Sequence, residues 1–468
     1  MGVTDIADDI VRLAEDARDG VNGLFEPTLR LRVTGLARAG KTVFITSLVA
    51  NLLARDRLTQ LRAAAEGRLI ATVLEPHPDR GTPRFDYEGH LAALSADPPR
   101  WPESTRRISQ LRLSIRYART GFIGGLQGPG TLHLDIVDYP GEWLLDLALL
   151  ELNYDEWSAR AMKAAEAPFR APHAARWRAA VAARDESAKF EEPAAQALAA
   201  AFTAYLAACR KAGLSGLAPG RFLMPGDLEG SPALAFCPLP PGRSPLRDEF
   251  ARRFEAYKRH VAKPFFRDHF ARIDRQVVLV DLMTALGEGP AAVADLGQAM
   301  MEALAAFRPG RNSWLSSILG RRIDRVLFAA TKADHLHHEE HPRLTAILSA
   351  LLRESVARAE FRGAEAEAMA IAALRATVEQ EGAGLRAVRG RLLSTGREAA
   401  LDPGELPRDP APVLAAARAA AAGEATNGWN GGGFRVMPFA PPLRTRGEGL
   451  PHVRLDRALE FLIGDRLA

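Results

Sequence analysis

The stretch GLARAGKT, which occupies residues 35–42, decides the fold of this chain. It matches the pattern G-x-x-x-x-G-K-[ST], in which a glycine-rich loop between a strand and a helix wraps phosphate groups with its backbone N–H groups. Residues 28–34 have strand character, and residues 42–54 have the apolar spacing of a helix. The stretch therefore stands in the context that the pattern requires, and it predicts a P-loop.

The chemistry of such a loop assigns a task to each of its parts. The ammonium group of Lys41 reaches the β- and γ-phosphate oxygens, and the hydroxyl of Thr42 binds Mg²⁺. The N-terminus of the following helix adds its partial positive charge. The predicted nucleotide-binding residues of this loop are Gly35, Arg38, Ala39, Gly40, Lys41, Thr42 and Val43.

Composition excludes several classes of protein. Apolar residues make up 47% of the 468 residues and charged residues 25%, which is ordinary for a globular chain. The net charge of +4 is too small for a polyanion-binding surface, so we expect no nucleic-acid partner. Two cysteines, an acidic N-terminus and no run of about 18 apolar residues argue against disulfides, a signal peptide and a membrane span. We expect a cytoplasmic protein, with any membrane contact peripheral to the inner membrane.

Periodicity divides the rest of the chain. Strand patterns alternate with helical ones, which is typical of a mainly parallel sheet covered on both faces. The predicted strands are 28–34, 69–74, 111–118, 132–138, 277–282, 325–330 and 368–374, and the predicted helices are 6–21, 42–54, 290–307 and 343–361. Residues 144–275 are rich in alanine, arginine and glutamate at helical spacing and predict an inserted all-helical domain. We therefore predict a P-loop domain built from residues 1–143 and 276–468, with residues 144–275 inserted.

The P-loop strand has one unusual property. Leucine and arginine alternate along residues 28–34, with arginine at positions 30 and 32. A central parallel strand is normally apolar on both faces. We expect polar material from the insertion to cover the arginine-bearing face.

The second motif is DIVDYPGE, residues 135–142. A strand that ends in Asp138 gives Mg²⁺ an acidic partner, and the amide of Gly141 can meet the γ-phosphate. D-x-x-G alone is a weak indication of a nucleotide site. It is a strong indication where it ends a hairpin strand downstream of a P-loop. We predict Asp138 as a residue of the metal site and Gly141 as a nucleotide contact.

The third motif is TKAD, residues 331–334, at the end of the predicted strand 325–330. Guanine presents N1–H and its exocyclic amino group side by side, and one carboxylate accepts both hydrogen bonds. Adenine lacks this pair of donors, so Asp334 would select guanine, and the stem of Lys332 would cover the face of the base. The alternative interpretation of Asp334 is a helix cap. Thr331, Lys332 and Asp334 are the predicted nucleotide-binding residues here.

The order of these motifs resembles that of the Ras-like GTPases, and the wider sequence resembles the YcjX family of bacterial stress-induced GTP-binding proteins. The most specific stretches are residues 33–44 and 137–143, and the resemblance covers the whole chain, including the insertion. It implies an α/β Ras-like P-loop NTPase sheet, GTP or GDP with Mg²⁺ as ligands, and a role as a switch in the stress response. It also implies that Ala372 and Ala373 form the base-contacting loop, with the Ala373 amide near the guanine oxygen.

Three residues depart from the Ras-like pattern. Thr331 stands where Asn is usual, Ala372 where Ser is usual, and Glu142 where the water-orienting Gln is usual. We predict Glu142 as a catalytic residue of a slow GTPase. The loss of Gln also favours an alternative, a nucleotide-gated scaffold with negligible hydrolysis. An ATPase is a further alternative, because a P-loop alone does not choose the base.

Arg38 is unusual for a P-loop. The loop resembles that of guanylate-binding proteins, in which the arginine at this place acts as an internal arginine finger. An arginine beside the γ-phosphate offsets charge that develops in the transition state, so Arg38 joins Lys41 and Glu142 as a predicted catalytic residue. The alternative is an arginine that points to solvent or pairs with an acidic residue of the insertion. The resemblance also implies a nucleotide-dependent homodimer, and the protein effector is unidentified.

One further metal-site residue is expected between the P-loop helix and the hairpin. A threonine there would sense Mg²⁺ and the γ-phosphate. We predict Thr105, with Thr82 as the competitor.

Four histidines follow the TKAD motif, at positions 335, 337, 338 and 341. His337 and His341 are one helical turn apart and could bind zinc if that segment is helical. The glutamate of a metalloprotease motif is absent from its place, because His338 follows His337. We therefore expect a surface-exposed cluster without a metal.

Overall fold

The computed structural model describes residues 26–36, 38–103, 105, 107–120, 128–270, 273–305, 323–353, 356–357, 360, 363–380, 386–424, 434–443 and 447–468. The predicted helix over residues 6–21 lies outside this range. Among the described helices, none combines the length and the apolar character that crossing a membrane requires.

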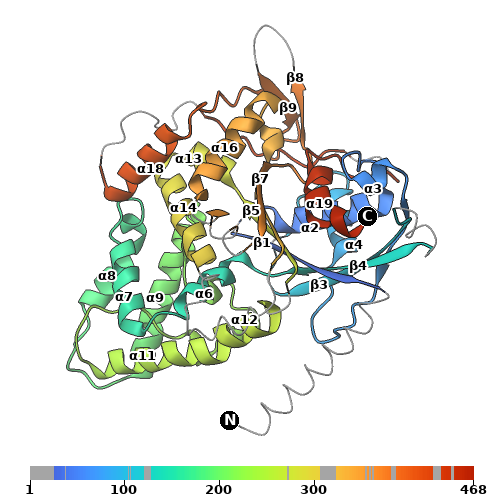
Figure 1. Ribbon diagram of the computed structural model, residues 1–468. Coiled ribbons are helices and arrows are strands. Elements are labelled where there is room, and N and C mark those ends of the chain that lie inside the picture. Colours follow the sequence, from blue (N-terminus) through green and yellow to red (C-terminus); the bar gives the residue numbers. More distant parts are fainter. Residues whose placement is uncertain are drawn as a thin grey trace.

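Seven strands form the central sheet, and in chain order they are β1 (Thr28–Gly35), β2 (Leu69–Glu75), β3 (Ser109–Tyr117), β4 (Gly130–Asp138), β5 (Arg275–Val280), β6 (Arg325–Ala330) and β7 (Glu365–Ala370). Their order across the sheet is β2-β3-β4-β1-β5-β6-β7 (Figure 1). β3 is antiparallel to β2 and β4, whereas β4, β1, β5, β6 and β7 run parallel. The predicted α/β class is confirmed, and the carboxyl ends of the parallel strands share one edge of the sheet.

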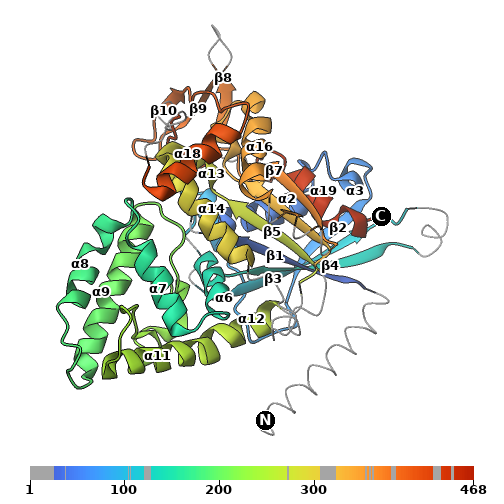
Figure 2. The same ribbon diagram turned by 60° about the vertical axis from the view of Figure 1, so that its left-hand side comes forward.

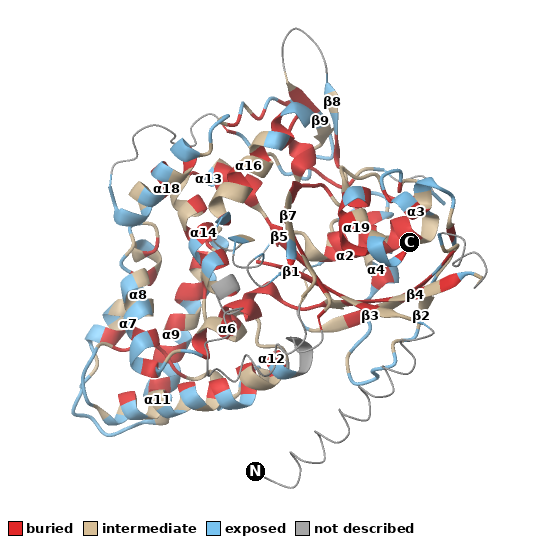
Figure 3. Ribbon diagram, in the orientation of Figure 1, coloured by how far each residue is buried: buried red, intermediate tan, exposed pale blue. Residues whose placement is uncertain are grey.

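Helices cover both faces of this sheet (Figures 1 and 2). The helices are α2 (Lys41–Ala54), α3 (Arg62–Ala65), α4 (Tyr87–Leu94) and α19 (Leu455–Ile463) on one face, and α13 (Leu282–Glu288), α14 (Pro290–Ala305) and α16 (His341–Leu351) on the other. β5 shows why two layers are needed: Val277 and Leu279 pack with the first group, and Val278 and Val280 with the second. The central strands β1, β5 and β6 are accordingly buried on both sides (Figure 3).

The chain between β4 and β5 is helical. Its helices are α6 (Leu145–Leu149), α7 (Tyr154–Ala164), α8 (Ala171–Ala182), α9 (Glu192–Lys211), α10 (Gly220–Leu223), α11 (Pro245–Tyr257) and α12 (Lys263–Phe270), with a π-helical turn at Lys258–Ala262. Aromatic rings hold them together, with Trp157 stacked on Phe254 at 5.0 Å and Trp177 on Tyr205 at 5.4 Å. The same apolar cluster continues under α14, so these helices and the sheet share a core. The division into domains at residues 143/144 and 275/276 stays a prediction.

The arginine-bearing face of β1 is closed by an aromatic ring. Arg32 is only 2% exposed, and its guanidinium lies 5.3 Å from the ring centroid of Tyr139, which follows β4. Tyr139 in turn packs edge-on against Phe265 of α12. The cover at Arg32 thus includes an aromatic residue of the D-x-x-G segment, which the expectation of polar material from the insertion did not foresee.

Several predicted boundaries shift for local reasons. The predicted strand 277–282 ends at Val280, because the Asp281 side chain caps α13 by accepting a hydrogen bond from the Thr284 N–H at 3.2 Å. The predicted strand 368–374 ends at Ala370. The predicted helix 343–361 begins at His341, and its first part, α16, ends at Leu351, with helical residues again at 353, 356–357 and 360. Beyond β7 lie elements that were not predicted: a three-stranded antiparallel sheet of β8 (Thr377–Gln380), β9 (Ala387–Arg391) and β10 (Glu398–Leu401), and helix α18 (Ala411–Ala422).

Candidate functional site

The loop between β1 and α2 is folded tightly over its own backbone. Gly40 has a φ of 83°, which a glycine adopts without steric cost, and Arg38 has a φ of 65°. A Cβ on Gly35 would stand 2.7 Å from the carbonyl oxygen of Leu279 in β5. The Lys41 ammonium donates a hydrogen bond to the Gly35 carbonyl at 3.0 Å, so its charge lies above the loop where phosphates would enter.

Three oxygen-bearing side chains meet beside this loop. Thr42 Oγ1 lies 3.3 Å from Thr105 Oγ1, and the Thr105 hydroxyl donates to Asp138 Oδ2 at 2.5 Å. Thr82, the competing threonine, donates instead to Asp79 at 2.9 Å in a different loop. The structure therefore brings together the three residues predicted for the metal site.

The chemistry of this group fits a hard divalent cation such as Mg²⁺, which prefers oxygen ligands. Asp138 is 1% exposed, and its Oδ1 has no hydrogen-bond partner among the described residues. Burial raises the pKa of Asp138 to about 6, against the opposing charge of Lys41. A buried carboxylate with one unsatisfied oxygen is costly, and a bound cation would remove that cost.

Gly141 brings the D-x-x-G segment against the P-loop. A Cβ on Gly141 would stand 1.7 Å from the Gly35 carbonyl oxygen and 3.1 Å from Lys41 Nζ. No side chain fits in this space, so glycine is required. The Gly141 backbone consequently lies beside the Lys41 ammonium, as the prediction of a nucleotide contact needs.

Glu142 extends away from the loop into the helical insertion. Its carboxylate is buried and forms an ion pair with Arg210 of α9 at 2.8 Å. This partner was not predicted, because Arg210 is distant in the chain and is one of many arginines. The predicted catalytic role of Glu142 would require its carboxylate to leave this ion pair.

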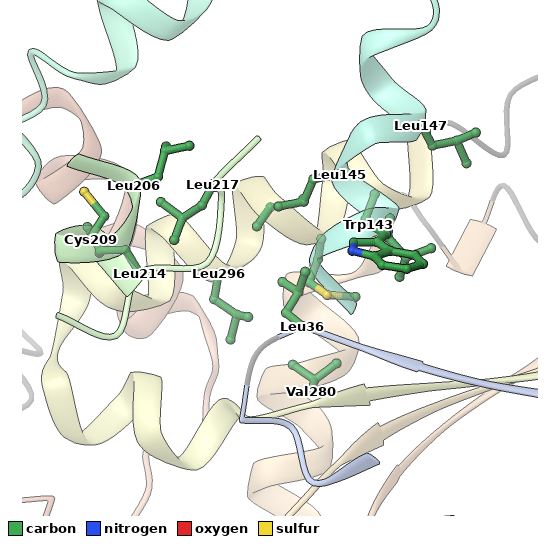
Figure 4. Packing of buried hydrophobic residues seen from close by; sticks show 14 of the residues in the cluster. Leu36, Trp143, Leu145, Leu147, Leu206, Cys209, Leu214, Leu217, Val280 and Leu296 are labelled. Atoms are coloured by element: carbon green, nitrogen blue, oxygen red, sulfur yellow. The ribbon is translucent and has the colours of Figure 1, made fainter. Parts of the chain in front are cut away.

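The residues after Glu142 are also embedded in the insertion. The Trp143 indole N–H donates to the Met224 carbonyl at 2.9 Å, and the guanidinium of Arg221 lies 3.2 Å from the centroid of its ring. A Cβ on Gly220 would stand 2.0 Å from the Glu142 carbonyl oxygen, so α10 touches this backbone directly. Figure 4 shows Trp143 in one apolar cluster with Leu36 of the P-loop and Leu206 of α9.

Asp146, in α6, is the buried acid of this contact. It accepts hydrogen bonds from the Gly220 N–H at 2.7 Å and from the Tyr257 hydroxyl at 2.6 Å. Burial raises its pKa to about 6, from the ordinary 3.8. The folded protein therefore holds this proton more tightly than the unfolded chain does.

Because the pKa of Asp146 is raised, its protonation favours folding below about pH 4, and this contribution is lost as the pH rises towards 6. We expect Asp146→Asn, which is neutral and nearly isosteric, to reduce the fall in melting temperature between pH 5 and pH 8. Thermal unfolding by circular dichroism at both pH values measures this, with the exposed Asp248→Asn as the control. An unchanged pH dependence in Asp146→Asn would contradict the assignment.

The TKAD loop is braced from two sides. The Thr331 hydroxyl donates to the Val280 carbonyl at 3.3 Å, and the Lys332 ammonium pairs with Asp281 at 2.5 Å. Lys332 has a φ of 62°, which turns the chain sharply after β6. Thr331 thus braces the loop to β5 although Asn is usual at this position.

Asp334 is buried and oriented by the segment that follows β7. Its Oδ2 accepts a hydrogen bond from the Ala376 N–H at 2.7 Å, and its backbone carbonyl accepts one from the Thr377 hydroxyl. A carboxylate has about four acceptor sites, so the bond to Ala376 leaves capacity for two donors of a base. Asp334 does not act as a helix cap in these contacts.

The predicted base-contacting loop lies beside Asp334. The Ala333 N–H donates to the Ile371 carbonyl at 3.0 Å, which joins the two loops. Ala372 exchanges two backbone hydrogen bonds with Val453, so its own amide is occupied. Ala373 is half-buried, and its contact with a base stays a prediction.

Arg38 is exposed on the outer side of the P-loop. Burial raises the pKa of Glu288 in α13, and the positive charge of Arg38 opposes part of this rise. Glu288 also touches the insertion, since a Cβ on Gly213 would stand 2.3 Å from its carboxylate. The charge of Arg38 therefore acts on an acidic group at the border between sheet and insertion.

The expectation of a surface-exposed histidine cluster is wrong for three of the four residues. His335, His337 and His341 are buried, and only His338 is exposed. His335 packs edge-on against Phe439 at 5.3 Å. His341 uses both ring nitrogens, one with the Ala333 carbonyl at 2.7 Å and one with Arg454 at 2.9 Å. It cannot join His337 in a zinc site as the helical spacing suggested.

A P-loop between β1 and α2, an aspartate at the end of β4 and a T-K-x-D loop after β6 define a Ras-like P-loop fold. The chain belongs to the YcjX-like family, DUF463, whose family model matches residues 29–467. A protein of Escherichia coli strain K12 named Ras-like GTPase YcjX is 38% identical over 97% of this chain and 99% of its own length. A protein of the same name from Shewanella oneidensis strain MR-1 is 35% identical over the full length of both chains.

Proposed function

We propose that this protein binds GTP and GDP together with Mg²⁺, hydrolyses GTP slowly, and acts as a nucleotide-controlled switch in the stress response. The observation that carries the proposal is the meeting of Thr42, Thr105 and Asp138 beside the Lys41 ammonium. The three side chains offer oxygen ligands to Mg²⁺, and the neighbouring Lys41 ammonium would hold the phosphates. The names of the two relatives support a GTPase.

Selection of guanine rests on Asp334. Its carboxylate is buried and accepts a hydrogen bond from the Ala376 N–H. Asp334 follows β6, which is separated from the P-loop strand β1 by β5 alone. Lys332 is held beside Asp334 by Asp281 and would cover one face of the base. This arrangement supports GTP over ATP, because adenine has no pair of adjacent donors for the carboxylate.

Slow hydrolysis rests on the catalytic groups Lys41, Arg38 and Glu142. The ion pair between Glu142 and Arg210 holds the carboxylate in the insertion, which favours the second candidate function, a nucleotide-gated scaffold with negligible hydrolysis. In either case residues 144–275 would carry the nucleotide state to an unidentified protein effector. A nucleotide-dependent homodimer would be one way to bring Arg38 over the γ-phosphate.

A binding and single-turnover experiment tests the proposed function. We expect purified protein to bind fluorescent GTP and GDP with Mg²⁺ at least ~10-fold more tightly than ATP, and to lose GTP affinity when Mg²⁺ is chelated. The rate of hydrolysis of bound GTP, measured in a single turnover, distinguishes a slow GTPase from a scaffold with negligible hydrolysis. Equal affinity for ATP would contradict the guanine assignment.

The role of Arg38 gives a sharper expectation. If Arg38 stabilises the transition state, Arg38→Ala slows single-turnover hydrolysis by ~10²–10³ while GTP affinity changes by no more than a few-fold. The matched control is Arg252→Ala, an exposed arginine of α11. A hydrolysis rate that rises with protein concentration would show that a second protomer holds Arg38 over the γ-phosphate. An unchanged rate in Arg38→Ala would return this residue to the solvent-exposed interpretation.

A further inference from the structure

Outside the nucleotide site, two histidines and a glutamate from different segments converge. Glu379 of β8 directs its Oε2 at both rings, 2.7 Å from His338 Nδ1 and 3.6 Å from His337 Nε2. Its other oxygen accepts a hydrogen bond from the His338 backbone N–H at 3.0 Å. The two rings are 4.4 Å apart and tilted by 37°. One carboxylate oxygen therefore faces two imidazole nitrogens.

A fourth side chain, that of Glu339, lies beside the two histidines. Ligand atoms of His337, His338 and Glu339 all lie within 4.8 Å of one another. Zinc–nitrogen and zinc–oxygen bonds are about 2.0–2.2 Å, so the ligand atoms of a tetrahedral site stand roughly 3.3 Å apart. Small rotations of exposed side chains close the remaining difference, because His338 and Glu339 are both exposed.

We propose that His337, His338 and Glu379 bind a divalent transition-metal ion, Zn²⁺, with Glu339 as the fourth ligand. Two imidazoles and carboxylate oxygens form a ligand set that zinc accepts and that Mg²⁺ does not favour. Glu339 would exchange its ion pair with Arg386, now 2.9 Å long, for the metal. His337 would give up the 3.5 Å contact from the Glu339 N–H to its Nδ1, because a ligating imidazole carries its proton on the nitrogen away from the metal.

The metal site lies beside the loop proposed to bind guanine, so an effect of the metal on nucleotide binding rests on the proposed function. Its ligands come from the segment after Asp334 and from β8, and residues 376–377, at the start of β8, also hold Asp334. Asp334 Oδ2 accepts from the Ala376 N–H, and the Asp334 carbonyl accepts from the Thr377 hydroxyl. A metal that ties His337 and His338 to Glu379 would fix β8 against the loop that selects guanine. Zinc is therefore expected to tighten guanine-nucleotide binding.

The metal site is tested first without nucleotide. Chelator-treated full-length protein is titrated with Zn²⁺ by calorimetry, and its metal content is measured after dialysis. We expect about one Zn²⁺ per chain in the wild type, at least ~10-fold weaker binding in His338→Ala and in Glu379→Gln, and no change in His260→Ala, an exposed histidine of the π-helical turn. Absence of stoichiometric zinc, or equal affinity in His338→Ala, would overturn the proposal.

Folding and nucleotide coupling are measured on the same samples. Circular dichroism shows whether each variant is folded, and Glu379→Gln keeps the size of the side chain. We expect Zn²⁺ to lower the Kd for GDP several-fold in the wild type and in His260→Ala, and to have no effect in His338→Ala. Zinc binding without any change in GDP affinity would contradict the coupling. Zinc binding in a protein that binds no guanine nucleotide would contradict the proposed function and leave the metal site standing.

Discussion

Lys41→Ala is expected to abolish detectable binding of GTP, a loss on the order of 10³-fold or more. The ammonium now donates to the Gly35 carbonyl at 3.0 Å, beside Gly141, and would turn to the β- and γ-phosphates when a nucleotide enters. Removing it leaves the phosphate charge without its main counter-charge in the loop. Calorimetry and the thermal shift caused by GTP and Mg²⁺ measure the loss.

The fold should survive this change, because Lys41 is only partly buried and stands at the first residue of α2. The control is Lys211→Ala at the end of α9, which removes an exposed lysine far along the chain from the loop. Its response to GTP should equal that of the wild type. A normal thermal shift in Lys41→Ala would mean that nucleotide binds somewhere else.

The parts of the site that depend on local sequence could be predicted. The P-loop needs a strand, a glycine-rich turn and a helix in succession, and all three are visible in the spacing of residues 28–54. Asp138 ends β4 and Asp334 follows β6, and the carboxyl ends of these parallel strands lie on the same edge of the sheet. Thr105 was a choice between two threonines, and only the structure brings it to Asp138.

The parts that depend on partners far along the chain could not be predicted. The pairing of Glu142 with Arg210 and the approach of Glu379 to His338 each join residues from separate elements. Periodicity reports only which face of one element is apolar, so it cannot select one arginine among many. The helical spacing of His337 and His341 suggested a pair, yet His341 is held by Ala333 and Arg454.

The contact between the D-x-x-G segment and the insertion would transmit a movement at the nucleotide site to the helices of the insertion. Gly141 touches the P-loop, and the next residues, Glu142 and Trp143, are held by Arg210 and by the Met224 carbonyl. A γ-phosphate that drew Gly141 towards it would pull on groups anchored in α9 and α10. The energy of that movement depends on breaking a buried ion pair, which is costly when one charge is left unpaired. The insertion therefore resists the change that the nucleotide would favour.

Asp334→Asn is expected to exchange the preference for guanine for a preference for xanthine. Guanine offers two donors to the Asp334 carboxylate, whereas xanthine carries a carbonyl where guanine has its amino group. The structure fixes the orientation of the new amide, because the Ala376 N–H, 2.7 Å from Asp334 Oδ2, still requires an acceptor. The asparagine carbonyl oxygen would satisfy Ala376, and its NH₂ group would then point towards the base.

An NH₂ group at that position repels the amino group of guanine and donates to the carbonyl of xanthine. Loss of the buried charge-assisted contact costs about 2–4 kcal/mol, so we expect GTP to bind roughly 30- to 700-fold more weakly in Asp334→Asn, and XTP to bind more tightly than GTP. Competition of fluorescent GDP with GTP, XTP and ATP measures the exchange. Asp185→Asn, which changes an exposed aspartate of the insertion, should keep the wild-type order. If Asp334→Asn keeps its preference for GTP over XTP, the carboxylate does not read the base, and the Ala376 contact is its whole role.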